Sequence, residues 1–195
     1  GDALIRDLES VVARFGPERV VAENIFEYYG MHLRAAVLPK VITRVVEATG
    51  CGLLLDLSHA RLAARDLGMD PFEYMDALPV HRLKEVHITG IQKIEGRWID
   101  RLRAEHVAQS KIEELSGREI DHVPMTTRDW PMLTSALERI DSGAWACPGM
   151  IAYEYGGVGP FFEALTRESL LSVQVPRMRR MIRAVYEREC VPLRA

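Results

Sequence analysis

An aspartate and a histidine stand three residues apart, directly after an apolar run. Asp56 and His59 follow Gly52–Leu55, a stretch with the length and composition of a buried strand. A carboxylate and an imidazole presented together suit metal binding or acid–base catalysis. The alternative is that Asp56 caps a helix N-terminus and His59 is a nearby surface residue. The entirely apolar strand before them favours a functional site.

Polar side chains of the same character follow four further short β-prone runs. They are Glu23, His87, the pair Asp121 and His122, and Glu154. When parallel strands lie side by side, their carboxyl ends share one rim, and residues far apart in the sequence converge there. Without a cation, the carboxylates on such a rim would repel one another. Carboxylates and imidazoles without thiolates predict a site for iron, manganese or zinc.

Helical periodicity fills the segments between these runs. We expect helices over residues 4–15, 38–49, 70–78, 127–140 and 166–188, the last of them interrupted or kinked by Pro176. Alternation of strands and helices predicts an α/β fold with a parallel sheet. Because no G-x-G-x-x-G motif follows a strand, a doubly wound sheet that binds dinucleotides is disfavoured, and part of a TIM-type β/α barrel is favoured.

The pattern accounts for about five β/α units in a single domain over residues 1–195, whereas a whole barrel has eight strands in about 250 residues. We therefore expect further β/α units before Gly1. A partial barrel exposes sheet edges and apolar helix faces. This exposure predicts a homo-oligomer or a complementing N-terminal chain.

Composition narrows the classes of function. The 195 residues are 48% hydrophobic, which is enough for one substantial core. The net charge of -3, with Lys and Arg dispersed among acids, argues against a nucleic-acid partner. No apolar run approaches the roughly 20 residues that cross a membrane, and no signal peptide opens the chain, so we expect a cytoplasmic protein without membrane association. The widely separated Cys51, Cys147 and Cys190 are expected to be reduced thiols.

Several of these segments resemble, in order, one protein family. They are Val21–Asn24 with Tyr28, Leu54–His59, the helix between Asp70 and Pro79, Val86–Gly90, and Tyr153–Tyr155 followed by Glu168. The chain resembles the DUF692 family, the multinuclear non-haem iron-dependent oxidative enzymes. The resemblance implies a xylose-isomerase-like β/α barrel whose rim holds two or three iron ions, with zinc or manganese as the alternative metals. It also implies oxidation, with O2, of a peptide or small-molecule substrate, and a substrate-recruiting partner protein.

The resemblance assigns a role to each matching position. Glu23 resembles the family's bridging glutamate, and Asp56 and His87 resemble ligands of the central metal. His59 resembles a ligand of the neighbouring metal, and Glu154 resembles the glutamate of the last strand.

Two features of the chain depart from the family. A close Asp-x-His pair usually follows the His87 position, but Asp100 occupies that spacing without a histidine. Asp121 and His122 come after an extra charged helix expected over residues 102–115, so we favour this pair and interpret residues 101–119 as an insertion. The family also takes two early histidines from strands that would precede Gly1. This chain alone is therefore expected to leave a metal site incomplete and to be a weak catalyst.

Other classes of protein share parts of this pattern. An endonuclease-IV-like phosphoesterase uses a similar series of ligands around zinc, a sugar isomerase or epimerase uses a related barrel, and a non-catalytic partial barrel would bind a partner only. Each ligand also has an ordinary structural interpretation. Glu23 could pair with Arg19 or Arg44, His87 could be a core histidine, His122 a solvated turn residue, and Glu154 a support for the glycine-rich turn.

Overall fold

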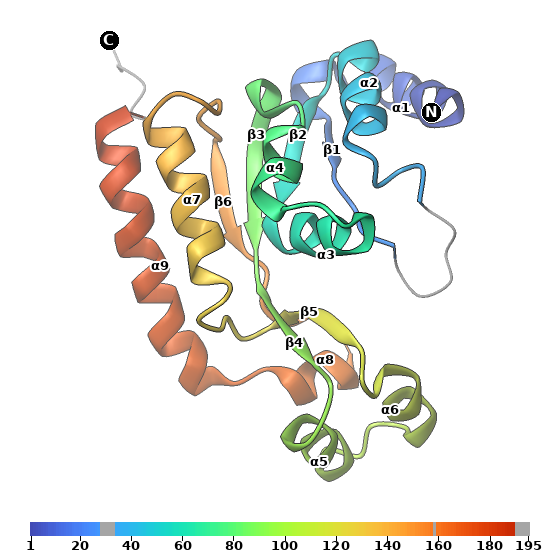
Figure 1. The fold of residues 1–195 in the computed structure, drawn as a ribbon, viewed down its shortest axis with the longest axis vertical. Coiled ribbons are helices and arrows are strands. Elements are labelled where there is room, and N and C mark those ends of the chain that lie inside the picture. Colours follow the sequence, from blue (N-terminus) through green and yellow to red (C-terminus); the bar gives the residue numbers. More distant parts are fainter. Residues whose placement is uncertain (28–33, 158, 190–195) are drawn as a thin grey trace.

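The computed structural model describes residues 1–27, 34–157 and 159–189. Strands and helices alternate along most of this length (Figure 1). The strands are β1 (Val21–Glu23), β2 (Gly52–Asp56), β3 (Leu83–Ile88), β4 (Gly90–Lys93), β5 (Glu119–Val123) and β6 (Met150–Tyr153). The helices are α1 (Asp2–Phe15), α2 (Pro39–Thr49), α3 (Leu57–Leu67), α4 (Pro71–Asp76), α5 (Arg97–Ala104), α6 (Gln109–Leu115), α7 (Trp130–Asp141), α8 (Pro160–Leu165) and α9 (Glu168–Glu189), with short 3-10 helices η1 (Pro17–Arg19) and η2 (Val80–Arg82). The α/β class expected from the sequence is confirmed.

Four strands form one parallel sheet in the order β1, β2, β3, β6. The register places Asp56 beside His87, and His87 beside Ala152. Strand β2 is central and buried along its whole length, as expected of a parallel strand that is covered on both faces. Because all four strands run the same way, their carboxyl ends meet at one rim.

The two faces of the sheet differ in chemistry, because side chains alternate along each strand. Leu53 and Leu55 of β2 and Val86 and Ile88 of β3 are at most 1% exposed and belong to the main apolar core. Of the alternate positions of β3, Leu83 is buried, whereas Glu85 and His87, which lie nearer the rim, are only partly buried. One face therefore packs in the core, and the other face carries polar side chains toward the rim.

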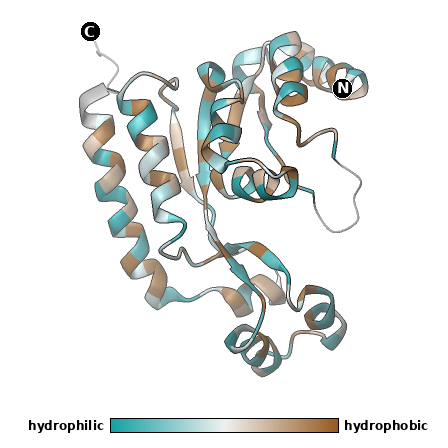
Figure 2. Cartoon of the chain, in the orientation of Figure 1, coloured by the Kyte–Doolittle hydropathy of each residue, from teal (hydrophilic) through white to brown (hydrophobic). Residues whose placement is uncertain are grey.

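Helices lie along both edges of the sheet. In Figure 1, α1 and α2 lie beside β1, and α7 and α9 run alongside β6. In α2 the buried residues include Ile42, Val45 and Val46, which is the spacing of one helix face. The guanidinium of Arg177 on α9 lies 3.9 Å from the ring centroid of Trp130 on α7. Figure 2 shows polar and apolar residues alternating along α7 and α9, as expected when one face of each helix meets the core.

A separate part of the molecule projects beyond the rim (Figure 1). We call it the arm; it consists of β4, α5, α6, β5 and α8. Strands β4 and β5 pair antiparallel. The arm has an apolar cluster of its own, whose buried members are Ile94, Trp98, Leu102, Ile112, Leu115, Ile120, Val123, Ala164 and Leu165. The arm is therefore a second, smaller packing unit attached to the sheet.

The arm overturns one prediction about the strands. The strand that carries Asp121 was expected to lie in the parallel sheet, but it is β5, which pairs with β4 instead. Strand β4 begins one residue after β3, so the chain has already left the parallel sheet before β5 is reached. The backbone folds tightly at this point, since a Cβ on Gly90 would lie 2.0 Å from the carbonyl oxygen of Pro124. The helix expected over residues 102–115 is also divided, into α5 and α6.

The other predicted elements agree with the structure to within a few residues. Helices α1, α2, α4, α7 and α9 correspond to the five predicted helices. Pro176 lies inside α9, which continues through it. Strands β1 and β6 are the edges of the parallel sheet, and within the described ranges the sheet does not close into a barrel. The structure therefore supports the parallel β/α part of the fold prediction and leaves the barrel as an expectation.

The cysteines differ in state. Cys51 is a buried free thiol, as expected, whereas Cys147 is disulfide-bonded, so the expectation of a reduced thiol is wrong for Cys147. Cys190 lies outside the described residues, as do Tyr28 and His32. Over the part of the chain that the structure describes, no helix combines the length and apolar character needed to traverse a bilayer.

Candidate metal centre

The rim of the parallel sheet collects ligand-type side chains from all four strands. Glu23 is the last residue of β1, and Asp56 is the last residue of β2. His87 is one residue from the end of β3, and Glu154 follows β6 directly. Parallel pairing aligns these strand ends, as the sequence analysis expected. The side chains gather into two groups whose ligand atoms lie within 4.8 Å of one another.

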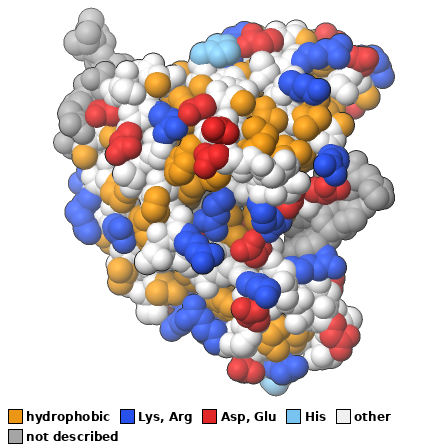
Figure 3. All heavy atoms as spheres, viewed as in Figure 1, with side chains coloured by type: hydrophobic (Ala, Val, Ile, Leu, Met, Phe, Trp, Pro, Cys, Tyr) orange, Lys and Arg blue, Asp and Glu red, His pale blue; other side chains and the backbone are white. Residues whose placement is uncertain are grey.

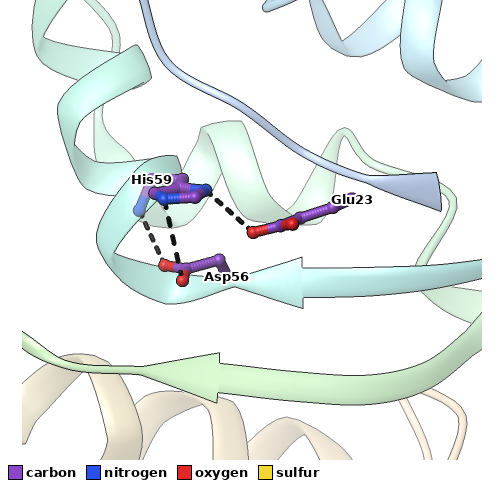
Figure 4. Close-up of side chains that lie close together, drawn as sticks. All are labelled: Glu23, Asp56 and His59. Atoms are coloured by element: carbon purple, nitrogen blue, oxygen red, sulfur yellow. Dashed lines mark hydrogen bonds and ion pairs between the residues drawn. The ribbon is translucent and has the colours of Figure 1, made fainter. Parts of the chain in front are cut away.

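The first triad consists of Glu23, Asp56 and His59 (Figure 4). Helix α3 begins directly after Asp56, whose Oδ1 accepts hydrogen bonds from the backbone N–H of Ser58 at 2.6 Å and of His59 at 2.8 Å. This cap fixes the first turn of α3, which carries His59. The Nδ1 atom of His59 lies 3.1 Å from Oε1 of Glu23. The hydrogen bond with the His59 ring holds the pKa of Glu23 below its ordinary value, against the effect of burial.

The arm adds a fourth group to the first triad. Oδ2 of Asp121 on β5 lies 3.0 Å from Nε2 of His59. Burial alone would lower the pKa of His59, but the hydrogen bonds with Asp121 and Glu23 and the charge of Asp56 raise it to about 11. The ring is therefore an imidazolium at neutral pH in the metal-free protein, and its positive charge partly offsets the surrounding carboxylates.

The second triad consists of Asp56, His87 and Glu154. Nδ1 of His87 lies 3.1 Å from Oε2 of Glu154. The other ring nitrogen, Nε2, lies 2.8 Å from Oε1 of Glu85, two residues earlier on the same strand. Burial opposes protonation of His87, but the neighbouring Glu85 and Glu154 raise its pKa above the ordinary value. The two triads share Asp56, so their positions are linked through one carboxylate.

Asp56 has one carboxylate oxygen in use and one without a hydrogen-bond partner. Its side chain is 1% exposed. Within the described residues, Oδ2 is buried and accepts no hydrogen bond. Burial raises the pKa of Asp56 above its ordinary value. A buried, unsatisfied carboxylate oxygen is costly, and coordination to a cation would relieve that cost. The Oδ2 position and the oxygen and nitrogen donors around it therefore fit a metal ion such as iron, manganese or zinc.

Asn24 joins the ends of β1 and β2 beneath the site. The side chain is fully buried, its Nδ2 donates to the carbonyl of Asp56 at 3.0 Å, and its Oδ1 accepts from the Asp56 N–H at 2.8 Å. The carbonyl oxygen of Asn24 lies 2.9 Å from Nδ1 of His59. Asn24 thus holds the ends of the two strands in the relation that the first triad requires.

The contacts of Glu23 and Asp56 bear on the ordinary structural roles that the sequence also allows for them. Arg19 pairs with Glu18 at 3.9 Å and Arg44 pairs with Asp2 at 2.6 Å, so neither pairs with Glu23. Asp56 is both a helix cap and a member of the two triads, because each role uses a different oxygen. The two interpretations of Asp56 are therefore compatible.

The remaining histidine and aspartate candidates lie outside both triads. His122 has a positive φ of 57°, its ring packs on Phe162 with centroids 5.5 Å apart, and its buried Nδ1 has no partner among the described residues. Its Nε2 lies 3.9 Å from Oδ2 of Asp121. Asp100 is exposed on α5, in the arm. The structure thus brings Asp121 to the site and leaves His122 and Asp100 apart from the triads.

Glu85 and Asn24 contact the candidate ligands although neither is predicted as a site residue from the sequence. The signal for Glu85 is its spacing, since residues i and i+2 of a strand share a face, and His87 was already a candidate. The signal for Asn24 is weaker, because an asparagine after a strand end does not reveal which neighbouring strand its amide will hydrogen-bond. His81 and His106 are exposed and lie outside both triads, and His81 Nε2 lies 2.7 Å from Oε1 of Glu47.

Comparison with known proteins identifies relatives of this chain. A family model described as RiPP precursor modification enzyme MbnB/TglH/ChrH matches residues 3–126. A UPF0276 protein of Acaryochloris marina is 32% identical over 89 residues, which is 46% of this chain and 32% of that protein. A UPF0276 protein of Caulobacter vibrioides is 36% identical over 72 residues, and one of Paraburkholderia phytofirmans is 41% identical over 71 residues.

These matches span only part of each relative. The aligned regions cover 37% of this chain and 26% of the Caulobacter protein, and 36% of this chain and 23% of the Paraburkholderia protein. The matched part of the chain thus corresponds to about a third or less of the length of these relatives. The family-model match includes Glu23, Asp56, His59, His87 and Asp121, whereas Glu154 lies beyond it.

Proposed function

Because the chain belongs to the family of RiPP precursor modification enzymes that includes MbnB, TglH and ChrH, we propose that it is a metal-dependent enzyme that modifies a peptide. The substrates of this family are precursors of ribosomally made peptides. The proposal places the metal ions at the first and second triads and the peptide at the rim of the sheet. A peptide substrate, rather than a nucleic acid, agrees with the acidic and basic side chains that are interspersed on the face shown in Figure 3.

The observation that carries the proposal is the position of Asp56. This carboxylate is common to both triads, and its buried Oδ2 is without a hydrogen-bond partner in the described residues. A carboxylate shared between two ligand groups can hold two cations a few ångströms apart and neutralise part of their charge. An ordinary cap or core aspartate would not need the two histidines and two further carboxylates that surround Asp56.

We propose iron as the metal and O2 as the co-substrate. Bound iron would supply the redox chemistry that oxidation of a peptide residue requires, which zinc does not supply. The oxygen and nitrogen donors of the triads also accept manganese or zinc, so the donor set supports iron without selecting it. The choice of iron follows the resemblance to the non-haem iron-dependent oxidative enzymes.

The proposed ligands differ in how far their side chains are exposed to solvent. Asp56, His59 and His87 are the enclosed ligands, since their side chains are at most 15% exposed. The Glu23 and Glu154 side chains are 38% and 39% exposed, so they mark the side from which a peptide would approach. The cap on α3 and the Asn24 amide keep the enclosed ligands in place.

Metal content is the direct test of this function. The protein should be purified without oxygen, analysed for metals, and then assayed for O2 consumption with a candidate precursor peptide. We expect iron in the purified protein, and loss of peptide modification after chelation with recovery on adding Fe²⁺. Zinc together with cleavage of abasic DNA would instead indicate the endonuclease-IV-like alternative. Failure to bind any of iron, manganese or zinc would contradict the proposal.

We propose further that the parallel sheet is part of a β/α barrel and that its β1 edge is covered by a complementing chain or by a second copy. Val21 of β1 is 36% exposed. Near it, an apolar groove of about 360 Å³ lies between α1 and α2, with Leu8, Val45 and Glu23 among the lining residues. An uncovered strand edge next to an apolar groove favours association.

Association should affect the metal site because the groove reaches Glu23. We expect the chain alone to hold metal loosely and to turn over weakly. The test compares iron stoichiometry and O2 consumption with and without a chain that carries the further β/α units of a relative, while light scattering reports the oligomeric state. Full iron loading and full turnover by a monomer of these 195 residues would contradict this part of the proposal.

A further inference from the structure

We propose that Glu85 is a positioning residue that holds the His87 ring so that Nδ1 faces the second triad. The inference rests on the proposed metal binding, since it concerns how one ligand is oriented. Glu85 contributes no ligand atom to either triad found among the described residues. Its role is to fix the ring of a neighbouring ligand.

The contacts of His87 divide between its two ring nitrogens. Nδ1 lies 3.1 Å from Oε2 of Glu154, a member of the second triad. Nε2 lies 2.8 Å from Oε1 of Glu85. A neutral imidazole carries one N–H and one free lone pair. If Nε2 donates to Glu85, the lone pair of Nδ1 is directed toward Glu154 and Asp56, where the metal would lie.

The strand provides the geometry for this contact. Glu85 and His87 occupy alternate positions of β3, so both side chains leave the same face of the sheet. The positions on either side, Lys84 and Val86, point the other way. Glu85 is therefore one step deeper along β3 than His87, and its side chain is 23% exposed. Backbone pairing on both sides of β3 fixes the distance between the two residues.

Hydrogen bonding of the distal nitrogen of a metal-binding histidine to a carboxylate fixes the tautomer and the ring orientation, and its removal typically weakens metal binding by about 10- to 100-fold. The His59 ring has carboxylates from separate elements on both nitrogens. By contrast, Glu85 is the carboxylate that contacts the His87 ring nitrogen facing away from the second triad.

The experiment measures Co²⁺ affinity, by competition with a chromophoric chelator, for the wild type and for Glu85→Ala, Glu85→Gln, His87→Ala and the double variant Glu85→Ala/His87→Ala. Glu47→Ala is the matched control, because Glu47 makes a similar contact of 2.7 Å with His81 away from the rim. Proton NMR of the Co²⁺ complex reports the hydrogen-bonded Nε2–H of His87. Thermal unfolding of each metal-free variant reports the state of the fold.

We expect Glu85→Ala to weaken binding of one ion by about 10- to 100-fold and to remove the Nε2–H resonance. Glu85→Gln keeps an acceptor oxygen, so it should recover most of the affinity and shift the resonance. In the His87→Ala background, Glu85→Ala should cause no further loss. The control Glu47→Ala should bind Co²⁺ like the wild type.

Several results would overturn the inference. Glu85→Ala with wild-type affinity would do so, as would an equal loss in the His87→Ala background. If Glu85→Ala does not fold, Glu85→Gln decides the matter, and an unshifted Nε2–H resonance in that variant would refute the contact. Absence of Co²⁺ binding by the wild type would instead refute the proposed function, which separates the two failures.

Discussion

The two triads share Asp56 but are built in different ways. In the first triad, His59 lies between carboxylates from two separate parts of the molecule, β1 of the sheet and β5 of the arm. In the second triad, His87 lies between Glu154 at a neighbouring strand end and Glu85 on its own strand. The second triad therefore depends on the parallel sheet alone, whereas the first also depends on how the arm docks. Variants that separate the triads test this difference.

The largest effect is expected from Asp56→Asn, because it removes a ligand from both triads. We expect both ions to be lost, measured by elemental analysis after gel filtration. The amide oxygen can still cap α3, and a buried charge is removed, so the free energy of unfolding should change by no more than about 1 kcal/mol.

Asp70→Asn is the control for Asp56→Asn. Asp70 caps α4 through the N–H groups of Phe72 and Glu73 in the same way, at 2.8 and 3.1 Å, but lies away from the triads. It should keep full metal content. Retention of both ions by Asp56→Asn would show that Asp56 serves only the helix.

The next largest effects should separate the triads. His59→Ala should lose the ion of the first triad, and His87→Ala should lose the ion of the second, each with the other ion retained. Titration with Co²⁺ and the visible spectrum of each complex provide the measurement. If either variant loses both ions, the sites are not independent in the way the geometry indicates.

The pH dependence of stability should come mainly from the first triad. The pKa of His59 is raised to about 11 from the unfolded value of 6.5, so its contribution is fully present below pH 6.5 and is lost as the pH rises through about 11. We expect the free energy of unfolding of the metal-free protein to fall between pH 7 and pH 10, by at most about 1.4 kcal/mol per pH unit for one proton. Chemical denaturation at several pH values measures this slope.

Two comparisons sharpen the pH prediction. His59→Gln should remove most of the slope, because the titrating group is gone. Metal must displace the proton from the ring to bind there, so binding at the first triad should release a proton and strengthen with rising pH. Calorimetry in buffers of different ionisation enthalpy counts that proton, and binding without proton release would contradict the assignment of His59 as a ligand.

The smallest effect is expected from Asp121→Asn. This change keeps the shape of the side chain but removes the negative charge that faces His59 Nε2 from the arm. We expect binding at the first triad to weaken by about 10-fold and binding at the second to stay constant. His122→Ala is the comparison on the same strand and should leave both affinities unchanged. A reversed outcome would make His122 the functional residue of β5.

The sequence predicted the rim better than the arm. Asp56, His59 and His87 could be singled out as candidates because each lies near the end of a β-prone run or shortly after it, and parallel strands align their ends. The pairing of β5 could not be foreseen, because the antiparallel return depends on the close contact of Gly90 with Pro124, which joins residues distant in sequence. The contact of Asp121 with His59 likewise appears only when the arm is in place.

The apolar cluster of the arm constrains how the sequence of this chain can evolve. Most of its members come from residues 94–123, but Ala164 and Leu165 come from α8, after β6. The side chain of Arg101 on α5 also joins the two segments, since its guanidinium donates to the Ala164 and Thr166 carbonyls. A recombination event that replaced only residues 94–123 would pack new side chains against the original α8, which supplies the rest of the same apolar cluster. The two segments must therefore diversify together, as one evolutionary unit encoded in two separate stretches of the gene.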